Sequence, residues 1–225
     1  MKKKINNHLL KFSFLTIIAL SFLILSPLAA NAQEDVKTLD PLNKTELLKN
    51  KVDAKKVDAL LKKMNKGVKL DSDKYLEQEL PLATSENQHF RKDFPDGSFV
   101  ESVIEDITEE VDTNLISPAA IGTIGKQGLF RTLRVSHLAP WGNQAFTVKI
   151  HLPLTGYAEI TRAYDWYYIG LVSGVDYRGI YRAKETATND AVAIQRLQIG
   201  MKGISFISKF DFRVRGGTYW TVYKS

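Results

Sequence analysis

Hydrophobic and polar residues alternate along most of the chain from residue 94 onward. In AFTVKIHL, residues 145–152, every second residue from Phe146 is apolar, and ISFISKFDFRVR, residues 204–215, repeats the pattern. A period of two is typical of a β-strand with one buried face. Gly, Pro, Asn and Asp turns separate about eight to ten such segments between 97 and 223. The pattern therefore predicts a mainly β protein, an antiparallel β-sandwich.

One segment of this region fits two structures. In DAVAIQRLQIGMKG, residues 190–203, the apolar residues Ala191, Ile194, Leu197 and Met201 satisfy a helical period. The same letters also alternate with a period of two, as they would in a strand. The sequence alone leaves the choice between strand and helix open for 190–203.

One or two short helices are expected before the strands. Asp53 is placed to cap a helix that Gly67 would end, and a second helical turn is expected around 73–79. The apolar stripe of the first helix recurs at i, i+3, i+4 and i+7: Val57, Leu60, Leu61 and Met64. We therefore expect a leader with a short amphipathic helix and a linker at 33–93, and the sandwich domain at 94–225.

The first 32 residues are predicted to be an export signal. Four lysines and no acidic residue accompany the apolar run FLTIIALSFLILSPLAA, and Ala30 and Ala32 supply small residues at positions −3 and −1 of a cleavage site. Cleavage near Ala32 would release a secreted protein, extracellular or associated with the cell wall. We do not expect an integral membrane protein after that cleavage.

Charge is unevenly distributed along the chain. Removing the signal lowers the net charge from +6 to +2, so the basic balance of the whole chain does not indicate a nucleic-acid partner. Residues 33–125 carry a net charge of −6 and residues 126–225 one of +8. The two halves could pair within one fold, or the basic half could form a surface for an anionic partner. The chain has no cysteine, which excludes disulfides and thiol chemistry.

Four aromatic residues lie within AYDWYYIG, residues 163–170. Alternation places Tyr164, Trp166 and Tyr168 on one face with Ile160, which predicts that these three rings belong to the core. Asp165 and Tyr167 fall on the opposite, outward parity. With Tyr177 and Tyr181 from the next strand, Asp165 and Tyr167 are the candidate ligand-binding residues.

Motifs for catalysis and metal binding are incomplete. His89, His137 and His151 are not spaced at i, i+3 or i+4, so no zinc-binding helix is predicted. Ser136, His137 and Asp165 have the residue types of a hydrolase triad, but the chain lacks a Gly-x-Ser-x-Gly turn. We expect no enzymatic activity, no cofactor and no metal site. A secreted hydrolase with two carboxylates far apart in the sequence is the open alternative.

Two short motifs carry a family resemblance. The helix-and-stop segment ALLKKMNKGVKLDS and the strand-opening FPDGS precede a Tyr- and Trp-rich β region. In these features the chain resembles a family of uncharacterised secreted Gram-positive (Firmicute) proteins that carry a domain of unknown function. The resemblance implies a β-sandwich and an extracellular address, and it transfers no catalytic residue. In composition, the C-terminal half is also similar to small secreted bacteriocins of the lactococcin type.

These observations together favour a secreted, non-enzymatic binding protein, extracellular or associated with the cell wall. Cell-wall polymer, carbohydrate and anionic lipid are the candidate partners, and nucleic acid is not. The alternative is a membrane-active secreted toxin or bacteriocin-like β protein, because alternating strands rich in Tyr and Trp suit a membrane interface. The identity of the ligand, the oligomeric state and the continuity of the basic surface are left open by the sequence.

Overall fold

The computed structural model describes residues 44–109, 128–201 and 204–224, so the expected signal at 1–32 lies outside the described residues. Three helices come first: α2 (Lys44–Lys49), α3 (Ala54–Asn65) and α4 (Asp71–Leu76). The strands follow: β1 (Pro81–Thr84), β2 (His89–Asp93), β3 (Phe99–Asp106), β4 (Leu129–Ala139), β5 (Gly142–Leu152), β6 (Glu159–Gly170), β7 (Val172–Arg182), β8 (Ala191–Met201), β9 (Ile204–Arg215) and β10 (Thr218–Lys224).

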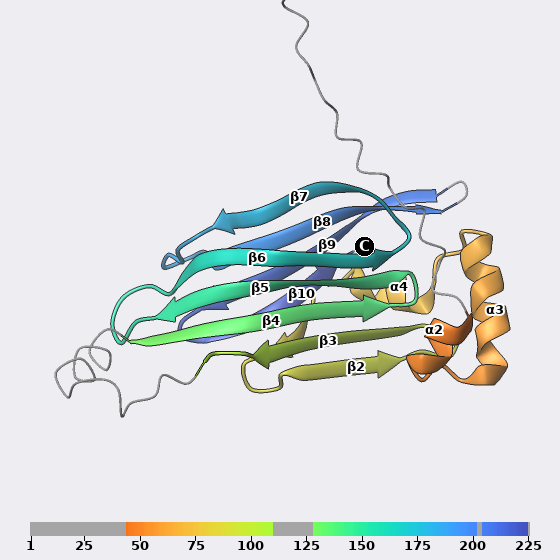
Figure 1. Ribbon diagram of the computed structural model, residues 1–225, viewed down its shortest axis with the longest axis horizontal. Helices are drawn as coiled ribbons and strands as arrows, with labels where there is room; N and C mark the ends of the chain where they lie inside the picture. The colour runs from red at the N-terminus through yellow and green to blue at the C-terminus, as the bar shows by residue number, and fades with distance from the viewer. Residues whose placement is uncertain (1–43, 110–127, 202–203, 225) are drawn as a thin grey trace, which may run out of the picture. The chain divides into compact units, whose positions relative to one another are not determined.

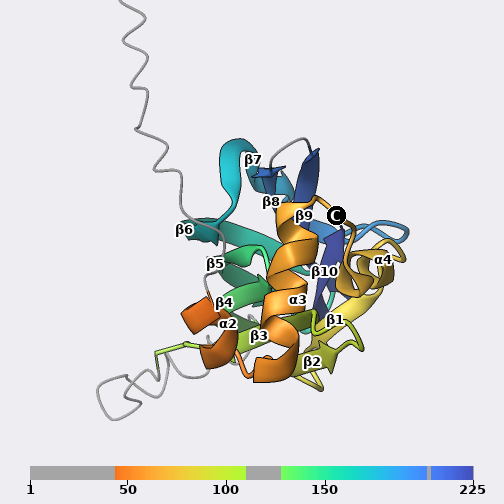
Figure 2. The same ribbon diagram turned by 90° about the vertical axis from the view of Figure 1, so that its right-hand side faces the viewer.

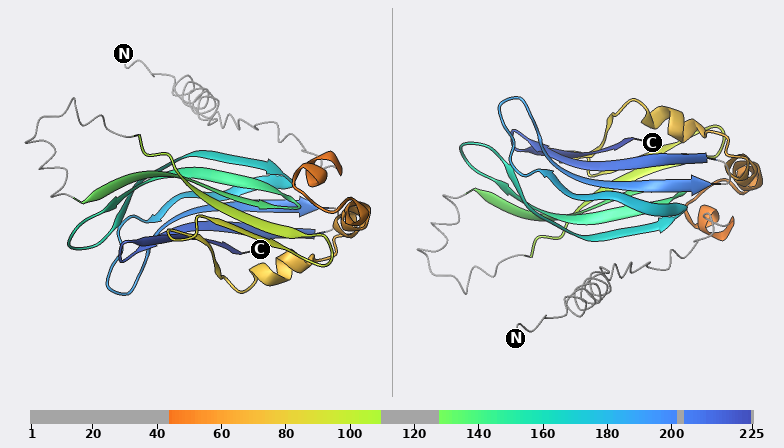
Figure 3. Two further views of the ribbon diagram at one scale, coloured as in Figure 1. Left: turned by 90° about the horizontal axis from the view of Figure 1, so that it is seen from below. Right: turned by 90° about the horizontal axis from the view of Figure 1, so that it is seen from above.

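The strands of the described residues form two antiparallel five-stranded sheets. Sheet A has the order β1-β10-β9-β8-β7, and sheet B has the order β2-β3-β4-β5-β6. The sheets lie face to face, as Figures 1 and 3 show. The predicted antiparallel β-sandwich, preceded by short helices, is confirmed. The edge strands β1 and β2 precede residue 94, the expected start of the strand-rich region.

Most strands pair with the next strand along the chain, and the chain changes sheet between β1 and β2 and between β6 and β7. The second crossing depends on Gly170, whose φ is +124°. A Cβ atom on Gly170 would lie 2.3 Å from the backbone oxygen of Trp141. The next residue, Leu171, donates its N–H to that same oxygen at 3.0 Å. Glycine is therefore required where β6 leaves sheet B.

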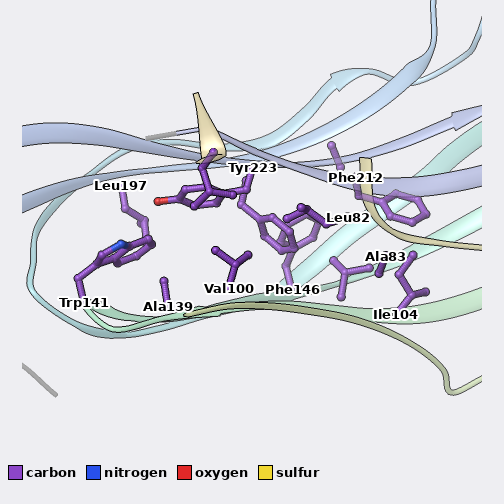
Figure 4. Packing of buried hydrophobic residues seen from close by; sticks show 14 of the residues in the cluster. Leu82, Ala83, Val100, Ile104, Ala139, Trp141, Phe146, Leu197, Phe212 and Tyr223 are labelled. Carbon is purple, nitrogen blue, oxygen red and sulfur yellow. The ribbon is translucent and has the colours of Figure 1, made fainter. Parts of the chain in front are cut away.

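The hydrophobic core lies between the two sheets, and Figure 4 shows part of it. Its largest fully buried rings are Phe99 and Phe146 from sheet B and Phe210, Phe212 and Tyr223 from sheet A. The segment left open by its sequence forms strand β8 (Ala191–Met201). Its core residues are alternate ones: Ala191, Ala193, Leu197 and Ile199.

Helix α3 lies across one end of the sandwich, as Figures 1 and 2 show. The Asp53 side chain accepts a hydrogen bond from the N–H of Lys55 at 3.0 Å, which caps the helix as expected. Val57, Leu60 and Met64 are buried, and Leu61 packs against the core. The predicted amphipathic stripe is therefore the face on which α3 docks.

Strand β6 departs from simple alternation. Its pairing with β5 shifts twice, because two residues of β6 lie opposite one residue of β5 near Thr161 and again near Asp165. Tyr164 consequently pairs with Thr147 on the outer face of sheet B. Trp166 still faces inward and stacks on Phe146, with 4.6 Å between ring centroids. The prediction that Tyr164 shares the core face with Trp166 and Tyr168 is therefore wrong.

Candidate functional site

The outer face of sheet A carries a row of basic residues. Arg196 on β8 pairs with Lys209 on β9, and Lys209 pairs with Lys224 on β10. Like charges placed directly opposite one another on neighbouring strands destabilise a sheet. Lys224 is neutralised by Glu79, with 3.1 Å between Nζ and Oε1. The stability of the sheet therefore does not account for this row of basic residues.

Alternation along β8 and β9 directs these cations outward. The inward residues of β9 include Phe210 and Phe212, which are fully buried in the core. Because successive side chains of a strand point to opposite faces, the residues between them point away from the core. On β9 the outward residues are Lys209, Asp211, Arg213 and Arg215. The polar side of the amphipathic strand β9 therefore contributes charged side chains to the outer face of sheet A.

These side chains line a groove of about 330 Å³ on the outer face of sheet A. The β7–β8 loop, residues 183–190, contributes Asp190 to the lining, and the end of β7 contributes Tyr181. Five cations line the groove against two carboxylates, Asp190 and Asp211. The cations are Arg182, Arg196, Lys209, Arg213 and Arg215. We call this hollow the basic groove.

Asp211 organises the middle of the basic groove. Its side chain is only 2% exposed. One carboxylate oxygen, Oδ2, accepts a hydrogen bond from Arg213 at 2.9 Å and lies 3.1 Å from Nζ of Lys209. Asp190 lies farther from its partners, 3.9 Å from Arg213 and 3.7 Å from Arg215. The two carboxylates therefore hold three of the five cations in place.

The other two cations of the groove have no carboxylate partner among the described residues. Arg196 has a buried Nε without a hydrogen-bond partner there, and its guanidinium lies 5.9 Å from the ring centroid of Tyr177. Arg182 donates to the backbone oxygen of Asp190 at 2.9 Å and lies 5.9 Å from the ring of Tyr181. Arg182 and Arg196 therefore supply two of the three positive charges by which the groove's cations exceed its carboxylates.

The four candidate binding residues do not form one cluster. Tyr177 and Tyr181 lie on β7 in sheet A, and Tyr181 lines the basic groove. Asp165 and Tyr167 lie on β6, the edge strand of sheet B, and neither lines the groove. The groove's arginines were absent from the candidates. The sequence does contain a pattern that points to them, because Lys209, Arg213 and Arg215 alternate with buried aromatic residues. From the sequence alone this pattern indicates only the solvent-exposed face of an amphipathic strand.

The side chains of the possible hydrolase triad are separated. Ser136 and His137 are successive residues of β4, so they face opposite sides of sheet B. His137 is fully buried and stacks on Tyr223, with ring centroids 3.9 Å apart. Burial lowers the pKa of His137 to about 3. A histidine in this environment cannot exchange protons with a substrate at neutral pH, which argues against a role as general base.

A second hollow, of about 310 Å³, lies on the outer face of sheet B. Two of its three Lys and Arg side chains pair with carboxylates: Lys49 with Glu46, and Arg91 with Glu101. Glu101 binds Arg91 at 2.7 Å and contacts Nε2 of His89 at 2.8 Å, and Arg91 also donates to the backbone oxygen of Asn50 at 2.8 Å. Lys51 is the one Lys or Arg side chain of this hollow without a carboxylate partner among the described residues, whereas the basic groove has two, so the hollow is a weaker candidate for an anionic ligand.

Within the described ranges, no group of three or more His, Asp or Glu side chains is placed to hold a metal ion. No helix of these ranges is long and apolar enough to cross a membrane.

Comparisons with known proteins assign no family. No family model matches the chain, and no curated protein matches it. A hypothetical protein from Listeria monocytogenes EGD-e, lmo2686, has a crystal structure at 2.75 Å that is similar to 64% of this chain and 98% of its own. The identity is 15% and the TM-score is 0.35, a similarity too low to carry an argument about function.

Proposed function

We propose that this protein is an exported, non-enzymatic binding protein that holds an anionic polymer of the cell surface in the basic groove. The observation that carries the proposal is the charge of the groove, where five cations face two carboxylates, and where Arg182 and Arg196 have no carboxylate partner among the described residues. A repeating anion would neutralise these two guanidinium groups, which bind phosphate and carboxylate oxygens with matched geometry.

The aromatic residues beside the groove support a polymer rather than a single small ion. Tyr181 lines the groove and is 62% exposed, and Tyr177 lies next to Arg196. The phenol of Tyr177 donates to the backbone oxygen of Ile180 at 3.3 Å, which holds its ring over Gly179. A ring held in this way can pack against the sugar or polyol backbone of a polymer while the arginines bind its anionic groups.

The test is retention of the purified protein on Gram-positive wall peptidoglycan that either carries its anionic polymer or has been stripped of it. We expect retention on the intact wall at low salt, loss of that retention at high salt, and little retention on the stripped wall. Equal retention on both preparations would show that the anionic polymer is not the ligand.

Two groove variants and one matched control locate the binding surface. Arg182→Ala and Arg196→Ala should each weaken retention on the intact wall by about fivefold, a loss of about 1 kcal/mol. Arg162→Ala is the control, because Arg162 also lies over a tyrosine, 4.6 Å from the ring of Tyr164, but belongs to sheet B. Equal losses for all three variants would point to net charge and would contradict a role for the groove.

A further inference from the structure

The end of the sandwich opposite α3 is built from the start of one strand and three loops, and one buried carboxylate ties these three loops together. These are the start of β4 at 129–130, the β5–β6 loop at 153–158, the β7–β8 loop at 183–190 and the β9–β10 turn at 216–217. We call them together the loop end (Figures 1 and 3). Glu185 accepts hydrogen bonds from the N–H of Ala158 and from the N–H of Gly216, each at 2.8 Å.

Four large apolar side chains of the loop end are exposed. Leu154 is 71% exposed, Phe130 50%, Tyr157 47% and Leu129 46%. Leu129 pairs with Leu152 in the β4–β5 ladder, which places the start of β4 beside the β5–β6 loop. Single exposed apolar residues are common on protein surfaces, but a group from two adjacent segments indicates a contact surface.

Two exposed lysines lie near this apolar group. Lys184 is exposed in the β7–β8 loop, and its backbone forms an isolated bridge with Glu159 at the start of β6. Lys149 is exposed on the outer face of sheet B, two residues before His151, on which the ring of Phe130 stacks at 4.3 Å. Glu185, the acidic residue next to Lys184 in the chain, is buried and accepts hydrogen bonds from two backbone N–H groups. Leu and aromatic side chains next to lysines are typical of a surface that lies in the interface of an anionic membrane.

We propose that the loop end binds the surface of a membrane that contains anionic lipid, with Leu154, Phe130 and Tyr157 inserted among the acyl chains. The apolar residues lie at the ends of strands and in a loop that projects beyond them (Figure 1), so they form a protruding tip rather than a groove. A tip can enter the soft interface of a bilayer, and the nearby lysines match its anionic head groups. This surface is separate from Arg196 in the middle of the basic groove.

Co-sedimentation with vesicles tests the proposal. The full protein should bind vesicles of phosphatidylcholine mixed with phosphatidylglycerol more tightly than vesicles of phosphatidylcholine alone. The double variant Phe130→Asp/Leu154→Asp should lose at least about tenfold in partitioning, because both apolar contacts are removed. Ile207→Asp is the matched control: Ile207 is also 50% exposed, but it lies on β9 far from the loop end, and its variant should bind as the wild type does.

Further variants separate this proposal from the binding function of the groove. Arg196→Ala should keep vesicle binding while its wall retention falls by about fivefold, and Phe130→Asp/Leu154→Asp should keep wall retention while its vesicle binding falls. Thermal melting should show that every variant is folded, because each substituted side chain is exposed or lies on an outer face. Failure of the wild type to bind anionic vesicles would overturn the proposal, as would equal binding by the tip variant. A wild-type dimer that the tip variant abolishes would instead assign the tip to contact with a second copy.

Discussion

Replacing His137 with phenylalanine should remove much of the acid sensitivity of this fold. The imidazole is fully buried and stacks on Tyr223, with Phe210 and Trp141 5.6 and 6.0 Å away between ring centroids. Neither ring nitrogen has a hydrogen-bond partner among the described residues. The neutral ring therefore serves as an aromatic core residue, and its protonated form has nothing to stabilise it.

The lowered pKa sets the sign and the size of the effect. Burial lowers the pKa of His137 to about 3, from an unfolded value of 6.5. As the pH falls, the unfolded chain therefore takes up this proton before the folded protein does. The contribution of His137 to the free energy of unfolding is fully present above pH 6.5 and is lost as the pH drops toward 3. The two pKa values correspond to a loss of about 2 kcal/mol at pH 5 and about 3 kcal/mol at pH 4.

Urea unfolding at pH 7.5, 6, 5 and 4 measures this loss. The wild type should lose about 2 kcal/mol more than His137→Phe between pH 7.5 and pH 5. Any packing penalty of the larger ring is the same at every pH, so it shifts the curve of the variant without changing its slope. If the free energies of unfolding of the wild type and of His137→Phe differ by the same amount at every pH, within about 0.5 kcal/mol, the reasoning is refuted.

Other buried groups near His137 do not produce the same signal. Burial raises the pKa of Asp73, so this carboxyl takes up a proton more readily in the folded protein and adds stability as the pH falls. Burial also raises the pKa of Tyr223, which affects only alkaline pH. Both groups are present in the wild type and in His137→Phe. The difference between the two curves therefore reports the histidine itself.

Three further predictions concern the fold and are measured by urea unfolding. Trp166→Ala should lower the free energy of unfolding by about 2–3 kcal/mol, because it removes a ring stacked on the core. Tyr167→Ala should change this free energy by no more than about 0.5 kcal/mol. Similar losses for the two variants would contradict the outward position of Tyr167. Gly170→Ala should lower the free energy of unfolding by at least about 2 kcal/mol, because the added Cβ atom would clash with a backbone oxygen. Gly216→Ala should lower it by about 1 kcal/mol, because Gly216 has open space around it and only its positive φ is unfavourable for alanine. The reverse order would exclude the clash as the cause. Glu185→Gln should cost about 1–3 kcal/mol by weakening two hydrogen bonds from buried or partly buried N–H groups, and an unchanged stability would show that Glu185 does not hold the loops together.

The local sequence was sufficient to predict the helices and strands and to predict which of their side chains are buried in most cases. The stripe of α3, the cap at Asp53 and the inward face of β5 follow from the spacing of apolar residues, because a helix or strand repeats with a fixed period. The inward position of Trp166 and the outward position of Tyr167 follow from the same rule. Alternation failed at Tyr164, where a bulge inserts an extra residue and reverses the two faces.

The charged surface and the buried histidine were decided by tertiary structure. Arg196 and Lys209 become neighbours through the register of β8 with β9, and Tyr181 joins them from β7. His137 gains its environment from Tyr223, which lies far along the chain in the other sheet. The sequence by itself determined which residues alternate, because a periodic pattern is local. Which outward residues share a face depends on strand order, register and bulges, and only the packed sheets specify those.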